Sequence, residues 1–110
     1  MEEFMKGDVV VIPFPFSDLS EQKRRPALVV ADLDSDDIIL CEITGRTRID
    51  KYSILLGQQD FEEGGLKVES IIRPNILFTA DKSIIAYKAG ELKEAKARQV
   101  TKELITIFSG

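Results

Sequence analysis

The sequence contains no histidine, which removes the most common general acid–base group and the most common ligand of transition metals. A Ser–His or Cys–His nucleophilic pair is therefore excluded, and we predict no metal site and no cofactor. The single cysteine, Cys41, cannot form a disulfide within the chain and lies in an apolar run. We expect it to be a reduced core residue, as is typical of a cytoplasmic protein.

Long apolar runs are also missing. None approaches the roughly 20 residues that cross a bilayer, and residues 1–6 carry acidic side chains where a signal peptide would be apolar. A chain of 110 residues, 44% hydrophobic and 31% charged, has the composition of an ordinary globular domain. We therefore expect one domain over residues 1–110, in the cytoplasm and without a membrane partner.

Excess positive charge is lacking as well, because the formal net charge is −4. Overall charge therefore argues against nucleic-acid binding. The basic residues are nevertheless clustered, in one group at Lys23, Arg24 and Arg25 and in a second at Arg46, Arg48 and Lys51. If the fold brings the two groups together, an acidic protein carries a local anion site.

Apolar, β-branched runs predict strands over residues 9–12, 27–31, 38–44 and 52–56, and further extended pieces at 66–73 and 76–80 that are interrupted at Pro74-Asn75. Residues 83–87 are either another short extended piece or the approach to a helix. The short acidic segment 32–37 predicts the turn of an antiparallel hairpin, and residues 57–65 read as a surface loop. Residues 91–108 repeat apolar side chains with helical periodicity, which predicts one amphipathic helix. Strands followed by a terminal helix indicate an α+β fold, a small, strongly bent antiparallel sheet or partly open barrel.

Three short motifs carry a family resemblance. Gly7-Asp8 precedes the first strand, Ser20-Glu21-Gln22 lies in the following loop, and Arg25-Pro26-Ala27-Leu28-Val29-Val30 opens the second strand. With Ile43-Thr44 downstream, this order and spacing resemble the MazF/PemK-like toxins, the endoribonucleases of type II toxin–antitoxin pairs. The resemblance implies an SH3-like barrel of the kind shared by MazF and CcdB toxins, with a C-terminal helix.

The resemblance also implies a site. Arg25, Thr44 and Glu21 match the catalytic positions, Glu21 as an auxiliary base, and Ser20 and Gln22 match the substrate loop. That loop is one residue shorter and more basic than usual, which offers further phosphate contacts. Phe14 and Phe16 alternate along the chain, so one of them can face the groove and stack on a base. The expected RNA-binding residues are Phe16, Ser20, Gln22, Lys23, Arg24, Arg46 and Arg48, and Phe14 and Arg73 complete the candidates.

These residues can support RNA cleavage without histidine. The 2′-hydroxyl of RNA attacks the neighbouring phosphorus, so the protein must orient it and stabilise charge on the phosphoryl oxygens, which the planar guanidinium of arginine does well. The resemblance therefore implies a metal-independent, sequence-specific endoribonuclease acting on single-stranded mRNA, leaving 2′,3′-cyclic phosphate and 5′-hydroxyl ends. It further implies a homodimer and a cognate, MazE-like antitoxin.

Two alternatives remain open at this stage. One is a CcdB-like toxin of the same fold that binds gyrase, although such a protein has no need of the Arg25–Thr44 pair. The other is a non-catalytic module that binds nucleic acid or protein, which the negative net charge favours.

Overall fold

The computed structural model describes residues 3–13, 24–46 and 49–110. The strands are β1 (Asp8–Pro13), β2 (Arg24–Asp32), β3 (Asp37–Gly45), β4 (Ile54–Leu56), β5 (Phe61–Gly64), β6 (Ser70–Asp81) and β7 (Tyr87–Leu92). The α-helix α1 spans Glu94–Ser109, and two short 3₁₀ helices span Gln58–Asp60 (η2) and Lys82–Ile84 (η3).

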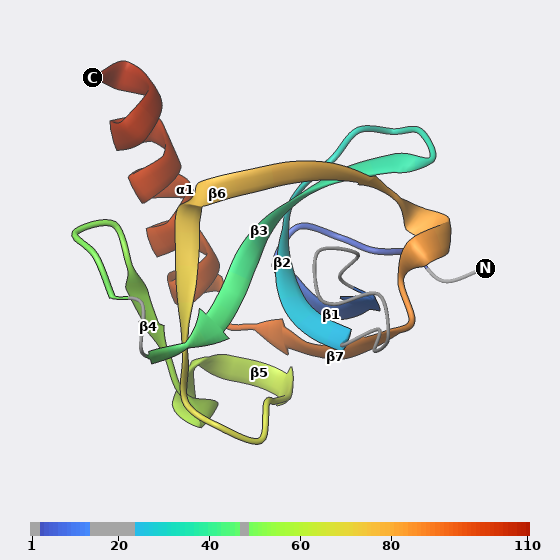
Figure 1. Ribbon diagram of the computed structural model, residues 1–110, viewed down its shortest axis with the longest axis horizontal. Helices are drawn as coiled ribbons and strands as arrows, with labels where there is room; N and C mark the ends of the chain where they lie inside the picture. Colours follow the sequence, from blue (N-terminus) through green and yellow to red (C-terminus); the bar gives the residue numbers. More distant parts are fainter. Residues whose placement is uncertain (1–2, 14–23, 47–48) are drawn as a thin grey trace, which may run out of the picture.

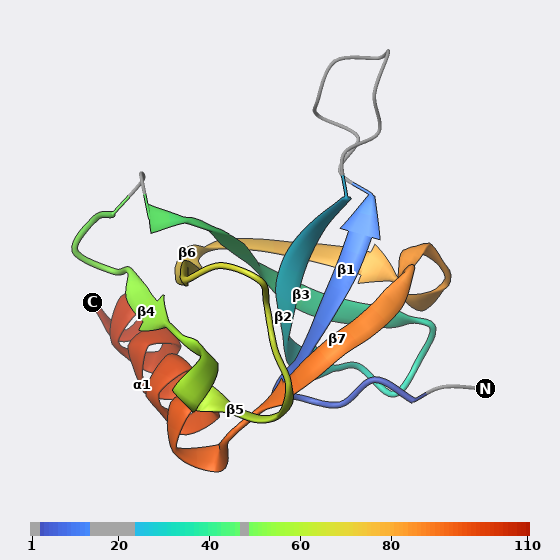
Figure 2. The ribbon, with the colours of Figure 1, turned by 90° about the horizontal axis from the view of Figure 1, so that it is seen from below.

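The seven strands form one sheet in the order β4-β6-β3-β2-β1-β7-β5, and each pairing is antiparallel. The sheet curls strongly, so that β6 arches across β3 and β2 (Figure 1). The helix lies beside β4 (Figures 1 and 2). The predicted bent antiparallel sheet with a C-terminal helix is confirmed. Among the described residues, the helix is too short and too polar to cross a membrane.

The central strands β1, β2 and β3 bury side chains on both faces of the sheet, which explains their continuous apolar runs in the sequence. One face forms a core with Val100 of α1, and its fully buried side chains include Val9, Leu28, Cys41, Ile43 and Ile72. The other face packs on Phe4 and includes Val10, Ala27, Val29 and Leu40. Because neighbouring residues of a strand point to opposite faces, β1, β2 and β3 serve both cores.

The Gly7-Asp8 motif has a structural role. Asp8 is only 2% exposed, and its carboxylate accepts a hydrogen bond from the backbone N–H of Met5 at 2.8 Å and lies 3.2 Å from Nζ of Lys88 on β7. Gly7 has φ of +97°, a left-handed conformation that favours glycine. Its N–H donates to Val29 and its carbonyl accepts from Leu92. The motif therefore joins the start of β1 to β2 and β7.

The hairpin predicted around residues 32–37 is confirmed, since β2 and β3 pair antiparallel. Asp34 adopts φ of +54°, and its N–H donates to the side chain of Asp32 at 3.1 Å. Such a local hydrogen bond is how aspartate supports a tight turn.

The predicted interruption at Pro74-Asn75 was wrong, because β6 runs unbroken from Ser70 to Asp81. The register with β3 shifts at this point: Cys41 pairs with Leu77 and Glu42 pairs with Arg73. Residues 74–76 thus form a bulge, and the missing N–H of Pro74 removes no bond from that ladder.

The predicted loop over residues 57–65 was also wrong, since it contains η2 and β5. Phe61 anchors β5 by burying its ring in the core, at 7% exposure. The segment 83–87 is divided between η3 and the start of β7. The helix begins at Glu94 instead of residue 91, because Glu91 and Leu92 belong to β7 and the Leu92 N–H donates to the carbonyl of Gly7.

Candidate functional site

A cavity of about 310 Å³ lies where β2 begins and β3 ends. Three segments meet there: the start of β2, the end of β3, and the residues around the start of β6. Its lining residues are Arg24, Arg25, Pro26, Ile43, Thr44, Gly45, Val68 and Ser70. The fold thus brings Arg24, Arg25 and Thr44, three of the residues that the family resemblance implies for the site, to the lining of one cavity.

The strand register explains why Arg25 and Thr44 meet. Ala27 pairs with Glu42 across β2 and β3, and the same antiparallel register continued by two residues sets Arg25 opposite Thr44. Directly opposed residues project from the same face of a sheet. Arg25 is paired with Ile12 of β1, and Thr44 with Ile71 of β6, so each backbone is held by a neighbouring strand.

The cavity is positively charged on an acidic protein. Arg24 and Arg25 are exposed, and its described lining includes no carboxylate. Within the part of the chain that the structure describes, neither guanidinium forms an ion pair. A guanidinium group is planar and always charged, and it can bind a phosphate through two parallel hydrogen bonds.

Thr44 is half-buried beside these arginines. A threonine hydroxyl can donate one hydrogen bond and accept others. The combination of two guanidinium groups and one hydroxyl can bind a phosphodiester and stabilise additional negative charge on its oxygens.

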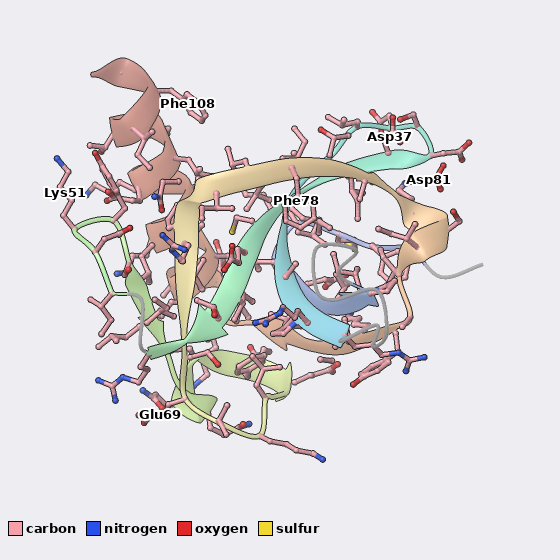
Figure 3. The ribbon with its side chains drawn as sticks, in the orientation of Figure 1. Asp37, Lys51, Glu69, Phe78, Asp81 and Phe108 are labelled. Carbon is pink, nitrogen blue, oxygen red and sulfur yellow. The ribbon has the colours of Figure 1, made fainter. Side chains whose placement is uncertain are left out.

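Arg46 lies at a neighbouring cavity of about 130 Å³ and does not line the first one. Its Nη1 donates to Oε2 of Glu69 at 2.9 Å, and both side chains are exposed. Glu69 lies just before β6, at the end of the molecule where β3 finishes (Figure 3). Ser70 lines both cavities, so the two are adjacent.

Ser70 and Val68 were not recognised from the sequence. Ser70 is buried and its hydroxyl donates to the carbonyl of Val68 at 3.1 Å, whereas Val68 is 68% exposed. A polar pair, Glu69-Ser70, ahead of an apolar strand was the only signal, and it does not distinguish a site from an ordinary strand start.

Six predicted site residues lie outside the described residues: Phe16, Ser20, Glu21, Gln22, Lys23 and Arg48, as does the candidate Phe14.

Cys41 is fully buried, and desolvation raises the pKa of its thiol to about 12, against a weaker opposing hydrogen bond from the Leu28 backbone. It is therefore a protonated core residue, as predicted. Among residues 3–13, 24–46 and 49–110, no group of three or more Cys, Asp or Glu side chains is arranged to bind a metal ion.

Comparison with known proteins places the chain in a family. Residues 5–108 match the sequence model of the PemK-like, MazF-like toxin of type II toxin–antitoxin system. No curated protein sequence matches the chain significantly.

Solved structures share the fold at low identity. A mycobacterial endoribonuclease in complex with its cognate antitoxin has a TM-score of 0.77 and 15% identity, over 97% of this chain and 96% of that one. MazF from Deinococcus radiodurans has a TM-score of 0.73 and 20% identity, over 96% of each chain. The Mycobacterium tuberculosis toxin MazF-mt6 has a TM-score of 0.71 and 14% identity, over 93% and 96%.

Proposed function

The chain belongs to the PemK-like, MazF-like toxins of type II toxin–antitoxin systems, and from this premise we propose that it is an endoribonuclease that cleaves single-stranded RNA. The observation that carries the proposal is the cavity in which Arg25 and Thr44 meet. It provides positive charge and a hydroxyl donor at one place on a protein of net charge −4.

The reaction is an attack by the 2′-hydroxyl of one nucleotide on the phosphorus that follows it. A bond forms between the 2′ oxygen and phosphorus, and the bond from phosphorus to the 5′ oxygen of the next nucleotide breaks. The products are a 2′,3′-cyclic phosphate and a 5′-hydroxyl. DNA lacks the 2′-hydroxyl and is not a substrate.

Arg25 binds the non-bridging oxygens and stabilises the charge that grows on them as the fifth bond to phosphorus forms. Thr44 donates a further hydrogen bond to the same group. The 2′ proton must pass to a base, for which Glu21 is the candidate from the sequence, and the 5′ oxygen takes up a proton as it leaves. Arginine provides the positive charge, so the proposed reaction does not depend on a metal ion.

Arg24 and Arg46 contact neighbouring phosphates, together with Ser20, Gln22, Lys23 and Arg48, while Phe16 stacks on a base. This local basic surface offsets the unfavourable net charge. Base contacts around the cavity would make cleavage specific for a short sequence in mRNA.

The partners follow from the same premise. One relative of this fold was solved with its cognate antitoxin. We propose that a MazE-like antitoxin blocks the cavity lined by Arg24, Arg25 and Thr44, here called the arginine cavity, through an acidic segment that mimics RNA. We also propose that the toxin is a homodimer and acts in the cytoplasm, where its mRNA substrate is found.

The test is cleavage of a long, unstructured RNA in EDTA by the wild type, Arg25→Ala and Arg98→Ala. Arg98 is an exposed arginine of α1 that pairs with Glu94, so its loss changes net charge equally but away from the cavity. We expect specific cuts with 5′-hydroxyl ends from the wild type and Arg98→Ala, and loss of cleavage in Arg25→Ala. The absence of cleavage by folded, antitoxin-free wild type would refute the enzyme and leave gyrase binding or a non-catalytic role.

A further inference from the structure

Arg73 of β6 is an arginine in an unusually enclosed position. Its side chain is 14% exposed, with Nη2 3.4 Å from Oδ2 of Asp50 and Nη1 3.9 Å from Oε1 of Glu42. Its Nε is buried and has no hydrogen-bond partner among the described residues. A charged group is rarely buried unless it is paired, and the two carboxylates provide that pairing.

The sheet register sets Arg73 close to the candidate site. Glu42 of β3 is directly opposite Arg73, and Thr44 is directly opposite Ile71. Arg73 and Thr44 are therefore diagonal neighbours on one face of the sheet. Continuing the β2–β3 register sets Arg25 directly opposite Thr44. Arg25, Thr44 and Ile71 then form one line of side chains across the sheet, and Glu42 and Arg73 belong to the next line.

Asp50, the second partner of Arg73, organises the turn that follows. Its carboxylate accepts from the N–H of Tyr52 at 2.8 Å, from the hydroxyl of Ser53 at 3.2 Å and from the amide of Asn75 at 3.5 Å. The Ser53 N–H donates to the Asp50 carbonyl at 3.2 Å, and the Asp50 N–H donates to Ser53 Oγ at 2.9 Å. Hydrogen bonds from the Tyr52 backbone and from Arg73 outweigh desolvation and hold the pKa of Asp50 below its usual value, so it is ionised at neutral pH.

Arg73 thus bridges two points on either side of Thr44 in the chain. Glu42 precedes Thr44 by two residues on β3, and Asp50 lies beyond Gly45, where β3 ends. Without the guanidinium, the carboxylates of Glu42 and Asp50 would be left uncompensated on the face that carries Thr44. They would repel an approaching phosphate, and the Asp50 turn would lose its tie to the sheet.

We propose that Arg73 is a positioning residue for RNA binding: it fixes the Asp50 turn against β3 and neutralises the carboxylates beside Thr44. The proposal rests on the proposed ribonuclease function. Arg73 does not itself touch the scissile phosphate, since its Nη1 and Nη2 face Glu42 and Asp50 and its Nε is buried. Its loss should therefore weaken RNA binding and leave the chemical step intact.

The test compares Arg73→Met, Asp50→Asn, Arg73→Lys and the double variant with wild type in steady-state RNA cleavage. For Arg73→Met we expect KM to rise about tenfold with kcat within about twofold, because ground-state binding alone is lost. Asp50→Asn loosens the turn but also removes one of the two carboxylates, so its KM should rise by less than that of Arg73→Met. The double variant should be no worse than the worse single variant, since both remove one interaction. Arg73→Lys, which keeps the charge but not the fork, should fall between wild type and Arg73→Met.

The matched control is Lys82→Met, which breaks the Lys82–Asp32 ion pair, 3.2 Å long and partly exposed, at the hairpin end of the molecule. It should leave KM and kcat unchanged. If Arg73→Met does not fold, Asp50→Asn decides the question. An unchanged KM in folded variants, or additive losses in the double variant, would overturn the proposal.

A second readout is independent of cleavage. In Arg73→Met, hydrogen exchange at the amides of Tyr52 and Ser53 should accelerate, while exchange within β1 and β2 should not. Inactive wild type with this exchange pattern would refute the ribonuclease and keep the positioning role. Active wild type with unaltered exchange and KM in the variants would refute the positioning role alone.

Discussion

In the proposed complex Glu69 competes with RNA for Arg46, and its replacement by glutamine should therefore strengthen RNA binding. Arg46 is the predicted phosphate contact at the smaller cavity, yet its Nη1 is 2.9 Å from the Glu69 carboxylate. A phosphate can engage this guanidinium fully only after the carboxylate is displaced. Glu69→Gln keeps the size of the side chain and removes its charge.

The size of the effect follows from exposure. The two side chains are 51% and 67% exposed, and ion pairs of this kind are worth about 0.2–1 kcal/mol. Since about 1.4 kcal/mol corresponds to a factor of ten, affinity should rise by a factor of about 1.4 to 5 at low salt. The carboxylate behaves as one internal counterion, so its loss should also steepen the dependence of log affinity on log salt, by up to about 0.7 for single-stranded RNA.

The assay is fluorescence anisotropy with a labelled RNA that is 2′-O-methylated throughout, which retains the phosphates but cannot be cleaved. Titrations at several salt concentrations give both the affinity and the salt slope. The matched control is Glu94→Gln, which changes net charge equally and also disrupts an exposed Arg–Glu pair, but on α1.

A specific gain in Glu69→Gln, with a smaller or absent gain in Glu94→Gln, would support the reasoning. Equal gains in both variants would show that only net charge matters. No gain in Glu69→Gln would show that Arg46 does not contact a phosphate or that the ion pair is negligible in solution.

Two further predictions concern the hydroxyl of the site and the ion pair between the buried carboxylate of Asp8 and the partly exposed Lys88. Thr44→Val should reduce the single-turnover cleavage rate by about 10²–10³, the usual cost of one donor to a developing oxyanion, whereas Thr44→Ser should retain most of the rate. Although burial alone would lower the pKa of Lys88, the hydrogen bond and charge of Asp8, with the charges of Glu91 and Glu63, raise it above 10.5. The ion pair of Lys88 therefore stabilises the fold fully below pH 10.5, and this stabilisation is lost as the pH rises through the folded-state pKa. Above pH 10.5 the urea midpoint should fall more steeply with pH for wild type than for Lys88→Met. Parallel curves for the two proteins would contradict this prediction.

The parts of the fold that could be predicted are those in which one local signal dominates. The valine and isoleucine runs of β1, β2 and β3 and the periodic apolar face of α1 were sufficient. Pro74 was misleading because its effect depends on the neighbouring strand: at a bulge the missing N–H costs no ladder bond, and no local pattern shows where the bulge falls. The start of β5 depends on Phe61 reaching the core, which is equally a tertiary property.

The candidate site likewise combines residues that local motifs indicate with contacts that depend on the tertiary structure. Arg25 and Thr44 were identified from motifs, but their juxtaposition depends on a strand register set by the hairpin between them and by a shift between Val29 and Ala31. The ion pair of Arg46 with Glu69 joins residues 23 positions apart, and that of Arg73 with Asp50 spans the same separation. Such pairings have no signature in composition or periodicity.

The burial of Cys41 has a practical consequence. The chain has one cysteine, it is fully enclosed, and with a pKa of about 12 its thiolate is scarce at neutral pH. Maleimide reagents should therefore leave the native protein unmodified. A cysteine introduced at the exposed Val68, on the rim of the arginine cavity, would become the single reactive thiol. A fluorophore attached there would report the arrival of RNA or antitoxin at that cavity, without any need to remove the natural cysteine from the core.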